Sequence, residues 1–143
     1  MLVKQLSVFL ENKRGKLHDV IDILAKNGVD ISALSLADTS DFGILRLIVD
    51  RPETAQKSLM DDGIIVSITD VVAVAMNDVP GGALGILNIL ANNDINIDYM
   101  YACVGKVTGK ALMVLRVEDN ELTERILFNN GYSNVNPADI YRI

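Results

Sequence analysis

The segment that decides the fold is residues 15–31, GKLHDVIDILAKNGVDI, because it occurs again as residues 81–97, GGALGILNILANNDINI. Six of the seventeen positions are identical at an offset of 66 residues. Each copy is typical of a helix that begins at a glycine, carries one apolar stripe and ends at a polar pair suited to a left-handed turn. A repeated structural unit predicts two similar domains in one chain.

The flanking segments extend the repeat. Residues 2–10 alternate as a half-buried strand does, with Leu6 and Val8 inward and Gln5 outward; residues 44–49 place Arg46 outward. The predicted order is strand 2–10, helix 15–27, strands 30–37 and 44–49, helix 52–62 and strand 64–68, then strand 71–76, helix 81–93, strands 96–104 and 110–118, a helix ending near Gly131, and a last strand within 132–143. The second hairpin is two residues longer, so the offset becomes 68 after it.

This order, β-α-β-β-α-β twice, predicts the α+β fold class: two tandem ferredoxin-like domains, 1–69 and 70–143, whose antiparallel sheets are paired side by side. No linker separates them. Residues 64–76 are nearly continuous β-prone sequence, so we expect the domains to pack directly against each other.

Composition excludes several functions. The net charge of -6 is shared evenly by the two halves, which argues against nucleic acid and against an anionic membrane. A single cysteine and a single histidine exclude an internal disulfide and a Cys/His zinc site, and no cofactor is expected. No apolar run reaches a membrane span of about 18 residues, and MLVKQLSVFL is too short and too alternating for a signal peptide. A cytoplasmic protein is expected.

Few side chains suggest chemistry. RNA-recognition modules share this strand order but need aromatic rings on central strands, and the first half offers only Phe42 near its hairpin. His18 is expected on a helix surface. Tyr99 and Tyr101 share a strand face and suit ligand stacking or, more often, interface packing; Cys103, on the same face, is expected to act as a small buried hydrophobe. Without a nucleophile–base pair, no catalytic residue and no enzyme activity are predicted.

The loops before the two repeated helices carry a different pattern. Free N–H groups and the helix dipole attract a carboxylate there, and glycine lets the backbone approach a ligand closely. Asp30 and Asn96 begin the following strands and offer oxygen acceptors for an ammonium group. The alternative is that these polar residues only cap helices and form turns. The candidate ligand-binding residues are Asn12, Lys13, Arg14, Gly15, Lys16, Leu17, Asp30 and Ile31 in the first half, and Asp78, Val79, Gly81, Gly82, Ala83, Asn96 and Ile97 in the second.

These residues resemble the ACT domain family in two tandem copies. The matching segments are NKRGKL followed by GVDI, and DVPGGAL followed by INI, in the register of that family's motif. Arg14 stands where the family usually has proline, and Ala83 where it usually has leucine. The strand INIDYM, residues 95–100, is similar to the tandem regulatory region of aspartate kinases.

The resemblance implies a non-catalytic regulatory protein that senses an amino acid at the interface between ACT domains. It implies ligand contacts at Asn12 and Asp30, or at Asp78 and Asn96, joined by the backbone around Gly15 and Gly81. The alternative is an adaptor or dimerisation module that docks on an enzyme of amino-acid metabolism without a ligand of its own. Leu84 and Ile89 add apolar area outside the main helical stripe, so a homodimer is expected.

Overall fold

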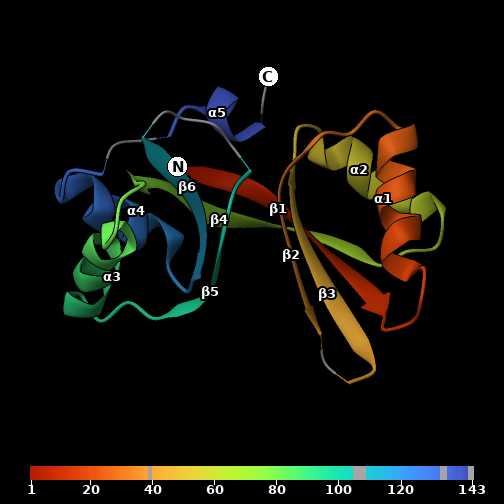
Figure 1. The fold of residues 1–143 in the computed structure, drawn as a ribbon, viewed down its shortest axis with the longest axis horizontal. Coiled ribbons are helices and arrows are strands. Elements are labelled where there is room, and N and C mark those ends of the chain that lie inside the picture. Colours follow the sequence, from red (N-terminus) through yellow and green to blue (C-terminus); the bar gives the residue numbers. More distant parts are fainter. Residues whose placement is uncertain (39, 105–108, 133–134, 142–143) are drawn as a thin grey trace.

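The computed structural model describes residues 1–38, 40–104, 109–132 and 135–141, with six strands and five helices among them (Figure 1). The first half holds β1 (Leu2–Glu11), α1 (Lys16–Lys26), β2 (Ile31–Asp38), β3 (Phe42–Val49) and α2 (Pro52–Asp61). It is followed by β4 (Val66–Asn77), α3 (Gly82–Asn92), β5 (Ile97–Ala102), β6 (Lys110–Val117), α4 (Asn120–Asn129) and α5 (Pro137–Tyr141). Most boundaries lie within two residues of those expected from the sequence.

The strands form one antiparallel sheet in the order β2-β3-β1-β4-β6-β5. Strand β4 is shared between the halves. It pairs with β1 from Val66 to Val72 and with β6 from Val72 to Asn77. The two strands predicted across residues 64–76 are therefore one continuous strand, and the predicted direct packing of the halves is confirmed.

The sheet curls until its two edge strands meet. Ala33 on β2 forms an antiparallel bridge with Cys103, and the Val104 N–H donates to the Ser32 carbonyl at 2.6 Å. Helices α1 and α2 cover the outer surface of the first half, α3 and α4 cover that of the second, and α5 lies over one end (Figure 1). This arrangement confirms the predicted α+β class with tandem ferredoxin-like halves.

The protein has three apolar cores, one under each pair of helices and one inside the curl of the sheet. The first packs α1 and α2 on the sheet through Val20, Leu24 and Leu59, and the second packs α3 and α4 through Ile86, Leu90 and Leu127. The third lies inside the curl, between the halves. Its buried members are Val3, Ala33, Ile48, Val71, Ala73, Tyr101, Leu112, Val114, Val135 and Ile140. The inner face of the sheet is therefore covered at its centre by the other half of the chain.

The last strand predicted within residues 132–143 is wrong: the described part of this segment contains the short helix α5. Proline is tolerated in a first helical turn, and the Asn136 Oδ1 accepts a hydrogen bond from the Ala138 N–H at 3.0 Å. The place beside β4 is also taken, because Leu2 pairs with Val72 there. The start of β1 thus supplies the edge that a fourth strand of the second half was expected to form.

The prediction of a half-buried β1 is also wrong at its centre. Gln5 was expected outward but is fully buried, because its face of β1 lines the third core. Arg46, likewise expected outward, places its guanidinium 3.7 Å from the centroid of the Tyr99 ring. The curl of the sheet, which no local pattern encodes, buries Gln5 and leaves Arg46 half-buried against Tyr99.

Candidate functional site

Both repeated helices begin at a glycine in the left-handed region. Gly15 has φ 85° and Gly81 has φ 80°, a conformation that glycine adopts at little cost. Neither α1 nor α3 has a side-chain hydrogen bond at its N-cap, whereas the Asp119 carboxylate caps α4 by accepting from the Leu122 N–H at 3.0 Å. The N-caps of α1 and α3 are glycines, so no side chain caps either helix at that position, while the loops before them form turns in which the Lys16 N–H donates to the Lys13 carbonyl and the Gly82 N–H to the Val79 carbonyl.

The loop before α1 is exposed and carries three cations. Its backbone is held by the Asn12 N–H, which donates to the Asp41 carbonyl at 2.9 Å. Lys13 forms an ion pair with Glu11 at 2.8 Å; this hydrogen bond lowers the pKa of Glu11 and raises that of Lys13. Arg14 and Lys16 are exposed beside it. The start of α1 thus presents positive charge, and the N–H groups of Lys13 and Lys16 there already donate to the carbonyls of Glu11 and Lys13.

The loop before α3 has a tighter backbone. The Asp78 N–H donates to the Gly109 carbonyl at 3.0 Å, and Val79 is 60% exposed. A Cβ at Gly82 would lie 2.0 Å from the Asn77 carbonyl oxygen, so only glycine fits there. Ala83 is half-buried against the second core. This loop offers backbone groups, with Asp78 as its charged side chain.

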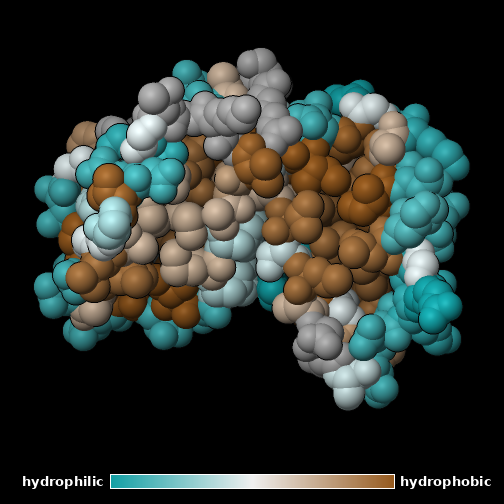
Figure 2. Space-filling model, in the orientation of Figure 1, coloured by the Kyte–Doolittle hydropathy of each residue, from teal (hydrophilic) through white to brown (hydrophobic). Residues whose placement is uncertain are grey.

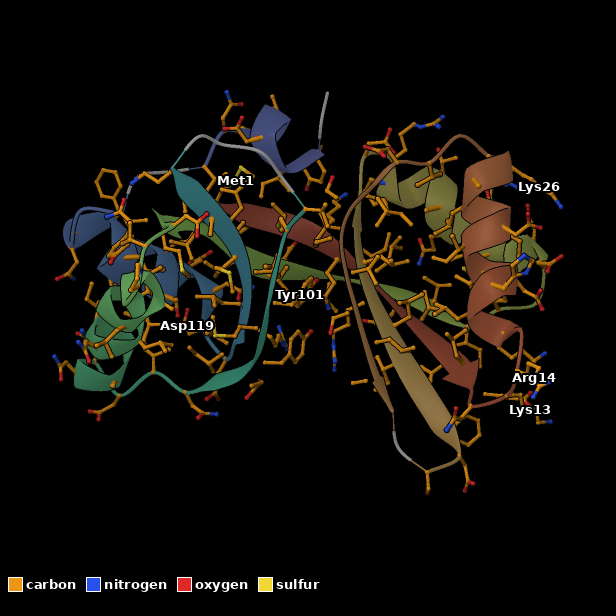
Figure 3. The ribbon with its side chains drawn as sticks, viewed as in Figure 1. Met1, Lys13, Arg14, Lys26, Tyr101 and Asp119 are labelled. Carbon is orange, nitrogen blue, oxygen red and sulfur yellow. The ribbon has the colours of Figure 1, made fainter. Side chains whose placement is uncertain are left out.

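Asp30 and Asn96 lie at the other ends of these helices. Helix α1 has 11 residues, which at about 1.5 Å of rise per residue separates Asn12 from Asp30 by roughly 16 Å. Figure 3 shows this separation, with Lys13 and Arg14 at one end of α1 and Lys26 at the other. The same length of α3 separates Asp78 from Asn96. The structure therefore does not bring together the loop and strand residues of one half.

The strand end at Asn96 is strongly acidic. Asn96 lines a hollow of about 190 Å³ together with Asp94, Asp98, Glu118 and Asp119. The Asn96 Nδ2 donates to the Asp98 Oδ1 at 3.3 Å. Carboxylates around an amide oxygen suit an ammonium group.

At the equivalent end of the first half, the Asp30 N–H donates to the Asp50 Oδ1 at 2.9 Å. Ile31 and Ile97, the other candidate residues at the strand starts, are half-buried against the first and second cores. Ile31 and Ile97 anchor the starts of β2 and β5 on these cores, and neither has a polar side chain to offer a ligand. Leu17, in the first turn of α1, is 37% exposed.

The remaining residues singled out from the sequence have structural environments. His18 is exposed and its Nδ1 lies 3.3 Å from the Asp19 carboxylate. Tyr99 and Tyr101 pack at the interface between the halves, which is the commoner of the two roles expected for them. Cys103 is half-buried against the third core. Within the described ranges, no group of three or more His, Cys, Asp and Glu side chains is placed to hold a metal ion.

Sequence reasoning missed the partners of the two tyrosines. The Gln5 Nε2 donates to the Tyr99 hydroxyl at 2.7 Å, and the Tyr101 hydroxyl donates to the Gln5 Oε1 at 2.6 Å. A glutamine on an alternating strand gives no local sign of burial. One signal was available: Tyr99 and Tyr101 lie on the same face of β5. When another part of the protein covers that face, their two hydroxyls need polar partners.

The ACT domain pair model matches residues 1–143, which is the whole chain. The chain belongs to the ACT domain family. An ACT domain pair is a regulatory module, and this one places both domains in a single curled sheet. No curated protein matches the chain.

Solved structures show the same fold. Protein BT0572 from Bacteroides thetaiotaomicron is similar at 38% identity with a TM-score of 0.91, over 100% of this chain and 98% of that one. The ligand-free regulatory subunit of aspartate kinase from Thermus thermophilus has a TM-score of 0.65 at 15% identity, over 90% and 92% of the two chains. At that identity the second likeness concerns the fold alone. None of the described helices is long and apolar enough to cross a membrane.

Proposed function

We propose that this ACT domain pair is a non-catalytic regulatory protein of the cytoplasm that binds an amino acid at an interface between ACT domains. The observation that carries the proposal is the pair of glycine-initiated helix ends at Gly15 and Gly81, both without a side-chain cap. Such ends bind carboxylates. The ammonium acceptors Asp30 and Asn96 lie a helix length away, so a complete site needs the strand end of another ACT domain.

Charge complementarity supports this pairing. The first loop carries Lys13, Arg14 and Lys16, whereas the hollow around Asn96 is lined by four carboxylates. Antiparallel association of two chains would bring a basic loop of one chain to the acidic strand end of the other. An amino acid between them would have its carboxylate against the loop N–H groups of residues 13–17 and its ammonium group against Asn96. The reciprocal contact would place the loop at residues 79–83 against Asp30.

Amino-acid binding is expected to stabilise the protein and to depend on the strand ends. A ligand at 100 times its dissociation constant raises the free energy of unfolding by about 2.7 kcal/mol, which a thermal-shift screen of all amino acids detects. Loss of one charged hydrogen bond in Asp30→Ala, Asp78→Ala or Asn96→Ala should weaken the binding of the best ligand roughly ten- to hundred-fold in calorimetric titration.

The control for that titration is Asn129→Ala, an exposed amide on α4 outside the loops and strand ends. Circular dichroism establishes that each variant is folded before it is titrated. Wild-type affinity in all three test variants would contradict the loop-and-strand site.

A homodimer is expected from the exposed apolar surface. Leu34 and Leu36 on β2 are 48% and 47% exposed, and Figure 2 shows a broad hydrophobic area over the region of β2 and β3. Leu84, singled out from the sequence, is 57% exposed, whereas Ile89 packs against the second core. Light scattering at micromolar concentrations should give the mass of a dimer for the wild type. The double variant Leu34→Glu, Leu36→Glu should give the mass of a monomer. Met60→Glu, an equally exposed apolar position on α2, is the matched control, and a monomeric wild type would refute the dimer.

The second candidate function is an adaptor that docks on a metabolic enzyme through the same apolar surface without its own ligand. The exposure of Leu34 and Leu36 on an edge strand favours it. The amino-acid screen separates the two, because an adaptor would show no stabilisation by any amino acid.

A further inference from the structure

The first half contains a pocket at the start of α1 that has Lys16 in common with the loop-and-strand site. It has a volume of about 350 Å³, within the lower range of small-molecule sites, and opens between the N-terminal turn of α1 and the segment after α2. Its apolar lining comes from Phe9, Leu10, Val20, Phe42, Ile64 and Ile65. Three of these side chains are exposed: Phe9 by 53%, Phe42 by 51% and Ile65 by 72%.

Charged side chains surround the apolar lining. Glu11, Lys16, Asp19 and Asp62 are exposed and complete the wall of the pocket. Among the described residues, the Lys16 ammonium makes no ion pair, while it helps to lower the pKa of Glu11. One cation and one carboxylate in the first turn of α1, two further carboxylates and an apolar lining match a zwitterion that carries an apolar side chain.

The repeat supplies an internal comparison. Glu11 pairs with Phe42 across β1 and β3 as Asn77 pairs with Lys110 across β4 and β6, so the two halves present equivalent positions. The second half has a hollow of about 240 Å³ at this place. At the repeat offsets, Ala75 replaces Phe9, Lys110 replaces Phe42, and Tyr132 replaces Ile64.

Most of the residues that line the second hollow are polar. The Lys110 Nζ donates to the Asn77 Oδ1 at 2.5 Å across it. A Cβ at Gly85 would lie 2.7 Å from the Tyr132 hydroxyl, so glycine at this position, where the first half has Asp19, leaves room for that ring. The two halves therefore have a hollow at equivalent backbone positions. The lining of the hollow is largely apolar in the first half, whereas in the second half it is polar and includes the Lys110–Asn77 hydrogen bond.

We infer that the first half is the one that selects the ligand, and that the ligand is an amino acid with a large apolar side chain, of the size of leucine or phenylalanine. This inference rests on the proposed function and deepens it. The side chain packs against Phe9, Phe42 and Ile65, and the carboxylate meets Lys16 and the N–H groups of α1. The ammonium group of the ligand remains at the mouth of the pocket, near the carboxylates of Glu11, Asp19 and Asp62. There it can also contact Asn96 of a neighbouring copy of the chain.

Selectivity follows from burial of apolar area. Each methylene placed in an apolar pocket strengthens binding by about tenfold or more, so leucine and phenylalanine should bind at least 100-fold more tightly than alanine. The side chains of aspartate and lysine bring less apolar area to Phe9 and Phe42, and the partial desolvation of their second charge costs free energy, so both should bind more weakly than leucine and phenylalanine.

The test is calorimetric titration of leucine, phenylalanine, alanine, aspartate and lysine into wild type and two variants that copy the second half. Phe42→Lys places an ammonium group in the apolar lining at an exposed position, and Ile64→Tyr adds to this pocket the ring that Tyr132 contributes to the lining of the second hollow. Each is expected to weaken leucine or phenylalanine binding by at least tenfold. Phe128→Lys on α4, 62% exposed, is the matched control and should bind as wild type does.

The outcomes separate the two levels of the proposal. Binding of only polar amino acids, or apolar binding that survives in folded Phe42→Lys, overturns the pocket assignment and leaves the amino-acid sensor in place. Failure of every amino acid to bind wild type overturns the proposed function itself, and the pocket assignment with it. If Ile64→Tyr does not fold, Phe42→Lys alone tests the pocket assignment, because the Phe42 side chain is not part of a buried core.

Discussion

Replacing Gln5 with leucine is expected to lower the free energy of unfolding by about 3 kcal/mol, because it removes the amide partner of the buried Tyr101 hydroxyl and of the hydroxyl of Tyr99, which is half-buried. Gln5 is fully buried between the halves, and its amide joins β1 to β5 through both Tyr99 and Tyr101. Leucine keeps most of the volume, so the loss reports hydrogen bonding more than a cavity. Urea unfolding followed by circular dichroism measures it.

A mutant cycle tests the mechanism of that loss. Burial raises the pKa of Tyr101, so its hydroxyl stays neutral and donates to Gln5 throughout the physiological range. Removing the hydroxyls in Gln5→Leu with Tyr99→Phe and Tyr101→Phe should restore part of the stability, because no tyrosine hydroxyl is then left without its glutamine partner. A cost below about 0.5 kcal/mol for Gln5→Leu, or strictly additive costs, would contradict the network.

Replacing Gly82 with alanine is expected to destabilise the protein by about 2–3 kcal/mol. The added Cβ would lie 2.0 Å from the Asn77 carbonyl oxygen, and backbone cannot yield as a flexible side chain does. The first turn of α3 or the end of β4 must move to relieve the clash. Thermal and urea unfolding give the loss.

The control for Gly82 is provided by the repeat itself. Lys16 occupies the equivalent position in the first half and already carries a side chain, so Lys16→Ala should change stability by less than about 0.5 kcal/mol. Equal effects of Gly82→Ala and Lys16→Ala would show that the close approach at Asn77 does not constrain the second loop.

Local patterns in the sequence determined the architecture of this protein. The repeat at residues 15–31 and 81–97 predicted two ferredoxin-like halves, since glycine, an apolar stripe and a polar exit encode the same helix twice. The left-handed turns expected after both helices are present at Gly28, with φ 67°, and at Asp94, with φ 56°. Such features depend on residues close together in the chain, so periodicity and turn chemistry predict them. The same patterns located the two loops of the candidate site.

Only the tertiary structure decided which residues meet. The curl of the sheet buried Gln5 and placed Arg46 against Tyr99, although both lie on strand positions that alternate outward. The rigid length of α1 separated Asn12 from Asp30, which the sequence alone had joined in one site. The contrast between the open pocket at Phe42 and the bridged hollow at Lys110 arises from side chains distant in the chain. Long-range packing sets these relations, because contacts between remote segments carry no periodic signature in either one.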